Sequence, residues 1–155
     1  MSASVLVSLR IAAPPQAVFD AFTQDIALWW RANPMLQLTP RGDGELRFEP
    51  GEGGRLMTTL AGGKEFEIGR ITTWAPPHVL AFTWRQATFP PDRVTNVEVR
   101  FEPIGEGTRV SVTHSGWDAI PQDHVARHGF PLVLIQQRQG AQWRAGMAAL
   151  SAGLG

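Results

Sequence analysis

The four histidines are the first residues to test for chemistry, since the chain contains no cysteine. His124 and His128 stand four residues apart in DHVARH, so on a helix they would share one face, as the histidines of the HExxH zinc motif do. Val125 stands where that motif has its catalytic Glu, and no third ligand is apparent nearby. We therefore expect two surface histidines and no metal site.

His114, Ser115 and Asp118 are residue types that form a catalytic triad. Their segment predicts a strand, in which neighbouring residues point to opposite faces, so His114 and Ser115 are not expected to meet. His114 falls on the inward face with Val110 and Val112. Two interpretations stay open: a hydrogen-bonded core histidine, or a polar anchor for a ligand in a cavity.

Two other patterns resemble parts of functional sites. Glu65 and Glu67 lie two apart, and thus on one strand face, but Phe66 and Ile68 occupy the opposite, apolar face. The glutamates are therefore expected on the solvated side. GEGGRL, residues 51–56, lacks the third glycine of GxGxxG and leads into a strand, so we expect a hairpin turn and no phosphate site.

Composition excludes several classes of partner. Lys plus Arg is 14 and Asp plus Glu is 14, so no net field attracts nucleic acid. The absence of cysteine removes disulfides, thiolate nucleophiles and iron–sulfur clusters. The apolar part of MSASVLVSLRI is too short for a signal peptide or a membrane span. We expect one domain over residues 1–155, no cofactor and a cytoplasmic location.

Alternation of apolar and polar residues predicts about seven strands. The first covers residues 5–11, where apolar side chains occupy every second position. From about residue 44 to 115, Gly and Pro clusters separate short alternating runs, as in an antiparallel meander. These runs are ELRFE, GRLMTTL, KEFEIGRITTW, HVLAFTWR, TNVEVRFE and TRVSVTHS.

Helices are predicted on both sides of these runs. Pro15 suits the first turn of a short helix, and Asp25 is positioned to cap a second one that ends at Trp29 and Trp30. From residue 130 onward, apolar side chains recur at helical spacing, which predicts a long amphipathic helix.

The expected fold class is α+β: a curved antiparallel sheet of about seven strands wrapped around a long C-terminal helix, with two short helices after the first strand. The terminal helix is the element long enough to cover the apolar face of the sheet. Neighbouring residues on a helix point about 100° apart, so one flat surface cannot hold both Trp29 and Trp30. We expect a hollow near the short helices, bordered by this pair.

The segments IAAPPQAVFDAFTQDIALWW, APPHVLAFTWR, FEPIGEGTRVSVTHSGW and QWRAGM occur in this order along nearly the whole chain. In this respect the sequence resembles the SRPBCC or START-like helix-grip superfamily. It is most similar to the branch homologous to the C-terminal domain of the activator of heat-shock-protein ATPase. The resemblance implies a cavity between the sheet and the long helix that, in many members, holds a lipid, steroid, polyketide or other apolar molecule.

Aromatic residues are the main candidates for the wall of such a cavity, because indole rings are bulky and carry an N–H that needs a partner. Indole N–H groups, His114 and Arg85 at the rim are the expected polar contacts. The residues predicted to bind a ligand are Trp29, Trp30, Phe48, Phe66, Phe82, Trp84, Val99, Phe101, Val112, His114, Ile135, Trp143 and Met147.

Three functional hypotheses follow. The first is non-enzymatic binding of a small apolar or aromatic ligand, with Trp30, Trp84 and Trp143 in the wall. The second is a chaperone-linked or stress-related protein-interaction module, which predicts an exposed apolar patch near Trp117, Ile120 and Phe130. The third is an enzyme of the polyketide cyclase kind with His114 as general base.

Overall fold

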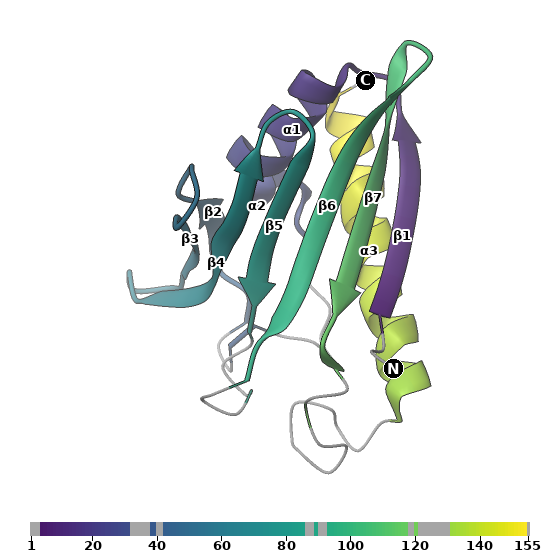
Figure 1. Cartoon of the computed structure of the whole chain (residues 1–155). Coiled ribbons are helices and arrows are strands. Elements are labelled where there is room, and N and C mark those ends of the chain that lie inside the picture. The colour runs from purple at the N-terminus through teal and green to yellow at the C-terminus, as the bar shows by residue number, and fades with distance from the viewer. Residues whose placement is uncertain are drawn as a thin grey trace.

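The computed structural model describes residues 4–31, 38–39, 42–85, 89, 93–117, 120 and 131–154, the side chain of Leu132 excepted. Its architecture is the helix-grip fold that the sequence predicts. A curved antiparallel sheet encloses a long C-terminal helix, and two short helices follow the first strand (Figure 1).

The sheet has seven strands in the order β1-β7-β6-β5-β4-β3-β2, with antiparallel neighbours throughout. β1 and β2 lie at opposite edges, so the chain between them, including the short helices, crosses the width of the sheet (Figure 1). The strands are β1 (Ser4–Ile11), β2 (Glu45–Phe48), β3 (Arg55–Thr59), β4 (Glu65–Ala75), β5 (Val79–Trp84), β6 (Thr95–Ile104) and β7 (Gly107–Ser115).

Strict alternation in β6 and β7 produces one buried face. Val97 lies opposite His114, and Val99 lies opposite Val112, all with at most 1% of their surface exposed. The intervening residues of both strands are exposed or half-buried, as the period of two requires. The predicted inward face of these strands, including His114, is therefore confirmed.

Irregular pairing in β3 and β4 accompanies the curvature of the sheet. The register shifts between Leu56 and Met57 in β3 and between Ile71 and Thr73 in β4. Gly69, which pairs with Leu56 at the first shift, lies so close to Thr83 that a Cβ atom there would overlap its backbone carbonyl. Bulges increase local twist and bend a strand, which lets β2 and β3 turn toward the helices.

The two short helices are α1 (Pro15–Gln24) and α2 (Ile26–Trp29), and Pro15 begins α1 as predicted. The predicted side-chain cap at Asp25 is wrong. Asp25 precedes α2, but its carboxylate makes no capping hydrogen bond. Its backbone N–H bonds the carbonyl of Ala21 and so closes α1, which fixes the Asp25 backbone at φ −113° and ψ 23°. One residue thus ends one helix and begins the next.

The long helix α3 (Leu132–Leu154) packs against β1 and α2. Its buried residues include Ile135, Gln139, Trp143, Met147 and Leu150, which recur every three or four positions, as the sequence predicts. No helix among the described residues is long and apolar enough to cross a membrane.

Candidate functional site

Trp29 and Trp30 both reach the interior because α2 ends between them. Trp29 is the last residue of α2, whereas Trp30 has an extended backbone with φ −60° and ψ 132°. The Trp30 ring lies 5.2 Å from that of Trp84 in β5 and 5.8 Å from that of Trp143 in α3, measured between ring centroids. Trp29 lies 6.4 Å from Trp143. These four residues form an indole cluster that joins α2, β5 and α3.

A chain of hydrogen bonds lies beside this cluster. The indole N–H of Trp143 donates to Nδ1 of His114 at 3.0 Å, and Nε2 of His114 lies 2.7 Å from the hydroxyl of Thr95. The Thr95 hydroxyl in turn donates to the backbone carbonyl of Trp84 at 3.0 Å. Since an indole only donates and the Thr95 proton is already used, His114 must be neutral and protonated on Nε2.

Burial reinforces this neutral state. His114 has no exposed surface, and desolvation lowers its pKa from 6.5 to about 3. The lone pair on Nδ1, which a general base needs, already accepts the Trp143 N–H. His114 is therefore a hydrogen-bonded core histidine in this structure, and the geometry does not support its predicted role as general base.

Asp43 is a buried carboxylate that the sequence did not single out. One of its oxygens accepts the indole N–H of Trp30 at 2.8 Å, and the other accepts the backbone N–H of Leu38 at 3.0 Å. The hydroxyl of Thr58 donates to the Asp43 backbone carbonyl. Asp43 thereby fixes the orientation of Trp30 within the indole cluster.

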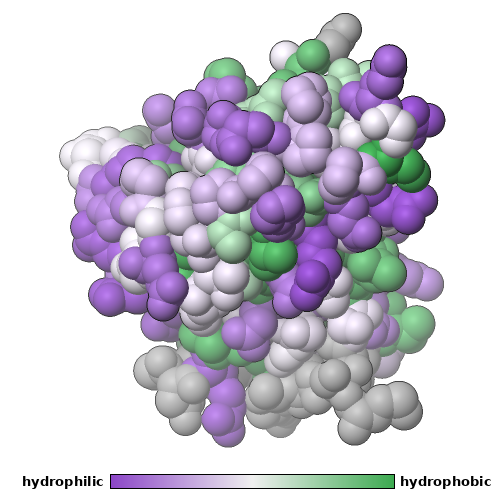
Figure 2. All heavy atoms as spheres, turned by 45° about the horizontal axis from the view of Figure 1, so that its top comes forward, coloured by the Kyte–Doolittle hydropathy of each residue, from purple (hydrophilic) through white to green (hydrophobic). Residues whose placement is uncertain are grey.

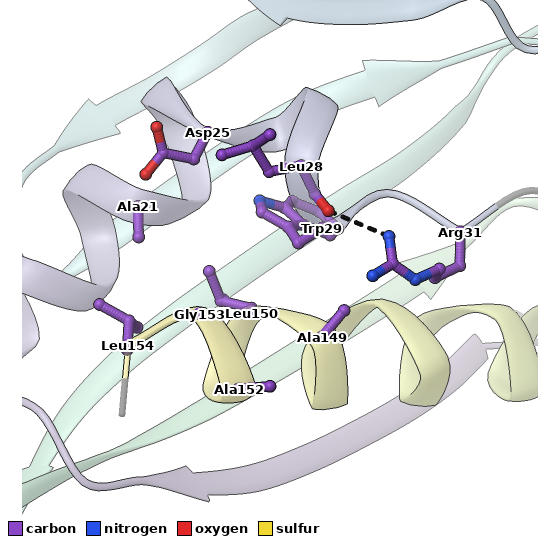
Figure 3. A pocket seen from close by; sticks show the side chains of 10 residues that line it. All are labelled: Ala21, Asp25, Leu28, Trp29, Arg31, Ala149, Leu150, Ala152, Gly153 and Leu154. Carbon is purple, nitrogen blue, oxygen red and sulfur yellow. Dashed lines mark hydrogen bonds between the residues drawn. The ribbon is translucent and has the colours of Figure 1, made fainter.

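A hollow of about 380 Å³ lies between the two short helices and the C-terminal end of α3 (Figure 3). Trp29 lines it, while the Trp29 N–H donates to the carbonyl of Phe22 at 3.2 Å. The residues that line the hollow are Ala21, Asp25, Leu28, Trp29, Arg31, Ala149, Leu150, Ala152, Gly153 and Leu154. The hollow lies near the short helices, as expected, but of the Trp pair only Trp29 lines it. None of its lining residues belongs to a strand, so it is not the predicted cavity between the sheet and the long helix.

Charged groups occur at two points of this hollow. Arg31 is exposed, and its Nη1 donates to the backbone carbonyls of Leu28 at 3.0 Å and Trp30 at 3.2 Å. The Gln142 side chain of α3 donates to the Arg31 carbonyl at 3.4 Å. Asp25 is also exposed. Neither residue was predicted as a site residue, because only the packing of α2 on α3 brings them to the same opening.

The structure places the predicted ligand-binding residues in several surroundings. Trp29 lines the hollow, while Trp30, Trp84 and Trp143 contact one another in the indole cluster. Phe82, Val99, Phe101, Val112, His114 and Met147 are buried within the same core, and Phe48 and Phe66 are half-buried against it. The roles of these residues in binding a ligand stay a prediction.

Ile135 belongs to a second, smaller core. It packs with Phe89, Trp117 and Ile120, none of which is more than 3% exposed. The predicted exposed patch at Trp117 and Ile120 is therefore wrong, because residues distant in sequence cover both side chains. On the face shown in Figure 2, hydrophobic residues form separate areas between hydrophilic ones.

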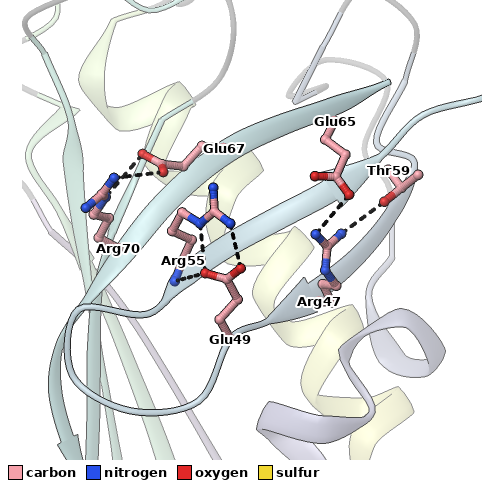
Figure 4. A network of polar contacts seen from close by, with 7 residues as sticks. All are labelled: Arg47, Glu49, Arg55, Thr59, Glu65, Glu67 and Arg70. Carbon is pink, nitrogen blue, oxygen red and sulfur yellow. Dashed lines mark hydrogen bonds and ion pairs between the residues drawn. The ribbon is translucent and has the colours of Figure 1, made fainter. Parts of the chain in front are cut away.

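The two glutamates of β4 lie on the solvated side, as predicted. Glu65 pairs with Arg47 at 2.9 Å and Glu67 pairs with Arg70 at 3.3 Å (Figure 4). A third pair on this surface joins Glu49 and Arg55 at 2.7 Å. Hydrogen bonding from Arg55 lowers the pKa of Glu49 to about 2. The glutamates of β4 thus belong to surface ion pairs and do not form a paired-carboxylate site.

Several predicted features lie outside the described residues, namely His124, His128, Asp118 and Phe130. Within the part of the chain that the structure describes, no group of three or more His, Asp or Glu residues is arranged to hold a metal ion. The segment GEGGRL forms the connection between β2 and β3, an antiparallel hairpin, as expected.

The curved sheet around α3, the two short helices and the family match given next define the class of protein: a START-like, or SRPBCC, helix-grip domain. A family model described as "Activator of Hsp90 ATPase homolog 1-like protein" matches residues 12–139, and the chain belongs to this family. A sequence comparison with curated proteins found no match.

Solved structures show the same fold. Protein MLL2253 from Mesorhizobium loti is 21% identical, with a TM-score of 0.69 over 97% of this chain and 96% of its own. PFC0360w, described as an HSP90 activator from Plasmodium falciparum, is also 21% identical, with a TM-score of 0.59 over 89% of this chain and 86% of its own. At this identity the likeness concerns the fold alone.

One similar structure has higher identity. Txn09, described as an anthrahydroquino-γ-pyrone synthase complexed with SUM, is 35% identical to this chain. The match covers 88% of this chain and 86% of Txn09, with a TM-score of 0.52.

Proposed function

We propose that this protein binds a small, largely aromatic molecule in the hollow between the short helices and the end of α3. The observation that carries the proposal is the hollow itself, which measures about 380 Å³ and has mostly apolar lining residues. Small-molecule pockets usually measure roughly 300–1,000 Å³ and combine apolar walls with a few polar groups. The hollow has this size and composition.

The groups around the hollow favour an aromatic acid. Because the Trp29 N–H is bonded to Phe22, the polar edge of the indole is satisfied, and a ligand would meet its apolar ring. Among the described residues, Arg31 bonds only through Nη1, to the carbonyls of Leu28 and Trp30, so Nε and Nη2 remain as donors for a ligand. A guanidinium binds a carboxylate through charge-assisted hydrogen bonds, which are stronger than bonds to a neutral acceptor.

The relationship to Txn09 also supports a small-molecule site. Txn09 is named for the synthesis of an aromatic product and was solved with a bound compound, and it shares 35% of its residues with this chain. The likeness to PFC0360w is confined to the fold, so chaperone activation is not carried over to this chain.

Binding to the hollow can be tested with naphthalene-2-carboxylate, measured by isothermal titration calorimetry and by methyl NMR of the leucines. Gly153 lines the hollow, and a Cβ atom there meets no atom within 4 Å, so Gly153→Leu starts in open space and adds its side chain at the opening. We expect this variant to bind about tenfold more weakly or worse, since it occupies the ligand's volume.

Ala145→Leu is the matched control, because Ala145 is exposed on the same helix and does not line the hollow. It should bind as the unaltered protein does, and methyl shifts should concentrate at Leu28, Leu150 and Leu154. Equal affinity in both variants, or shifts elsewhere only, would contradict the proposed site.

Catalysis is a second candidate, favoured by the description of Txn09 as a synthase. In that case Asp25 is the proton acceptor, since it is the carboxylate among the residues that line the hollow. Asp25→Asn should then abolish turnover of an aromatic substrate while retaining its binding. If Asp25→Asn turns over every accepted substrate at the original rate, this assignment is wrong.

A further inference from the structure

Arg85 and Trp117 lie at the end of the sheet near the start of α3, far from the hollow. Arg85 directly follows β5, and Trp117 follows β7 by two residues. Both strands run antiparallel to β6, which lies between them, so their C-terminal residues lie at the same end of the sheet (Figure 1). Ile135, near the start of α3, packs with Trp117, whereas residues 149–154 line the hollow. At about 1.5 Å per residue, the two places are roughly 20 Å or more apart along α3.

Phe89 connects Arg85 with Trp117. Nη2 of Arg85 lies 3.5 Å from the backbone carbonyl of Phe89, at the limit of a hydrogen bond. The Phe89 ring packs edge-on against Trp117, with 5.1 Å between the ring centroids. Phe89, Trp117, Ile120 and Ile135 form a buried apolar surface around these contacts. Phe89 thus contacts the guanidinium through its backbone carbonyl and the indole through its ring.

Both polar side chains have a buried N–H group without an acceptor. Nε of Arg85 and Nε1 of Trp117 make no hydrogen bond within the described residues. Trp117 is only 1% exposed, so bulk water does not compensate its N–H. A buried donor without a partner costs about 1–3 kcal/mol, and such groups in a folded protein call for an explanation. An acceptor that reaches both groups would remove this cost.

Charge determines the kind of acceptor. Arg85 is half-buried and forms no ion pair with any carboxylate in the described part of the chain. His114, whose ring centroid lies 6.4 Å from that of Trp117, is neutral and has both ring nitrogens bonded. A half-buried positive charge that has no counter-charge among the described residues favours an anion over a neutral acceptor.

From these contacts we infer that Arg85 and Trp117 form a second binding site, which takes a carboxylate attached to an apolar body. The two carboxylate oxygens accept the Nε–H of Arg85 and the indole N–H of Trp117, and the apolar body packs on Phe89 and Ile120. Two donors match the two oxygens of a carboxylate, whereas a phosphate group would leave acceptor oxygens unbonded beside apolar residues. This site is separate from the hollow at Trp29 and does not depend on it.

The indole N–H of Trp117 itself reports on the site by NMR. Sodium benzoate is the probe, with benzyl alcohol as its neutral analogue and acetate as the carboxylate without a ring. The signal is assigned as the indole resonance that disappears in Trp117→Phe, which keeps an aromatic side chain at this position. Benzoate should shift the Trp117 signal downfield along a saturable curve, and both analogues should bind about tenfold more weakly or worse.

Matched variants distinguish binding at Arg85 and Trp117 from a general effect of net charge and from binding in the hollow. Arg85→Gln should weaken benzoate binding at Trp117 at least about tenfold. Arg109→Gln removes the same charge from an exposed position of β7 and should leave the binding unchanged. Gly153→Leu, which fills the hollow, should also leave it unchanged.

Three results would overturn the inference. They are a Trp117 signal that does not respond to benzoate while the protein stays folded, equal responses to benzoate and benzyl alcohol, and loss of the response in Gly153→Leu. The first measurement uses the unaltered protein, so it stands even if a variant fails to fold. Failure here leaves the proposed function of the hollow intact, because that function is tested with other residues.

Discussion

The indole N–H of Trp143 donates to Nδ1 of His114, and this bond between α3 and β7 fixes the protonation of a fully buried imidazole. The other ring nitrogen is directed to Thr95 in β6. One neutral side chain thereby joins two strands of the sheet to the helix that the sheet encloses.

Neutral His114 predicts a loss of stability in mild acid. Its pKa is about 3 in the folded protein and ordinarily 6.5, so the unfolded chain binds a proton that the folded chain does not. Stability is therefore unaffected by this group above pH 6.5 and falls as the pH decreases from 6.5 toward 3, by at most about 1.4 kcal/mol per pH unit. Urea unfolding at a series of pH values measures this slope.

Two histidine variants provide the controls for that slope. His114→Gln should lower stability at pH 7 and flatten the dependence between pH 6.5 and 5. His78→Gln should change neither, because His78 is exposed. The same slope in His114→Gln and in the unaltered protein would show that another group titrates.

Asp43→Asn should destabilise the protein by about 1–3 kcal/mol, measured as the free energy of unfolding in urea. Both Asp43 oxygens accept an N–H, from Trp30 and Leu38. An amide offers one oxygen and places its NH₂ group against the other donor, so one buried N–H loses its acceptor. Asp25→Asn is the comparison, because Asp25 is exposed and makes no capping bond, and it should change stability by no more than about 0.5 kcal/mol. Similar losses in the two variants would contradict the role assigned to Asp43.

Gly146→Ala should lower the thermal midpoint even though alanine favours helices. A Cβ atom at Gly146 would lie 3.1 Å from Cζ3 of Trp29, whose ring is only 2% exposed and packs against the rings of Phe22, Trp30 and Trp143. Overpacking costs about 1–3 kcal/mol, against a gain of about 1 kcal/mol in helix propensity, so we expect a net loss near 1 kcal/mol. Gly153→Ala in the same helix meets no atom within 4 Å and should not destabilise. A more stable Gly146→Ala protein would mean that the Trp29 ring shifts to make room.

The carboxyl group of Glu49 should titrate near pH 2, as followed by ¹³C NMR of its side chain. Arg55 contacts both carboxylate oxygens and favours their charged form, so Arg55→Gln should raise the pKa of Glu49 toward its ordinary value of about 4.3. This ion pair stabilises the fold above that pH, and its contribution is lost as the pH falls toward 2. An unchanged midpoint in Arg55→Gln would exclude Arg55 as the cause.

The fold could be predicted from the sequence because the alternation of apolar and polar residues and the helical spacing of apolar residues are local signals. Apolar residues at every second position predicted the inward faces of β6 and β7, and spacing by three or four predicted the buried stripe of α3. Asp25 shows the limit of a local rule, since its backbone is set by the end of α1 as well as by the start of α2.

The candidate sites depend on contacts between distant segments, and there sequence patterns were insufficient. Asp43 stands in a Gly-rich segment typical of a turn, and its buried role arises only because it lies against Trp30, 13 positions earlier. Trp117 and Ile120 were expected to be exposed, but Phe89 and Ile135 cover them. The hollow likewise forms only because α2 packs near the end of α3, and no local sequence pattern in either segment predicts that contact.

The pairing of β1 with β7 has a consequence for biosynthesis. Ser8 and Ser111, whose hydroxyls bond across these strands, are 103 positions apart. The first strand therefore leaves the ribosome long before its neighbour is translated, and contacts between such distant segments form slowly. Until then its valines and leucines are open to other nascent chains, so β1 depends on protection during synthesis.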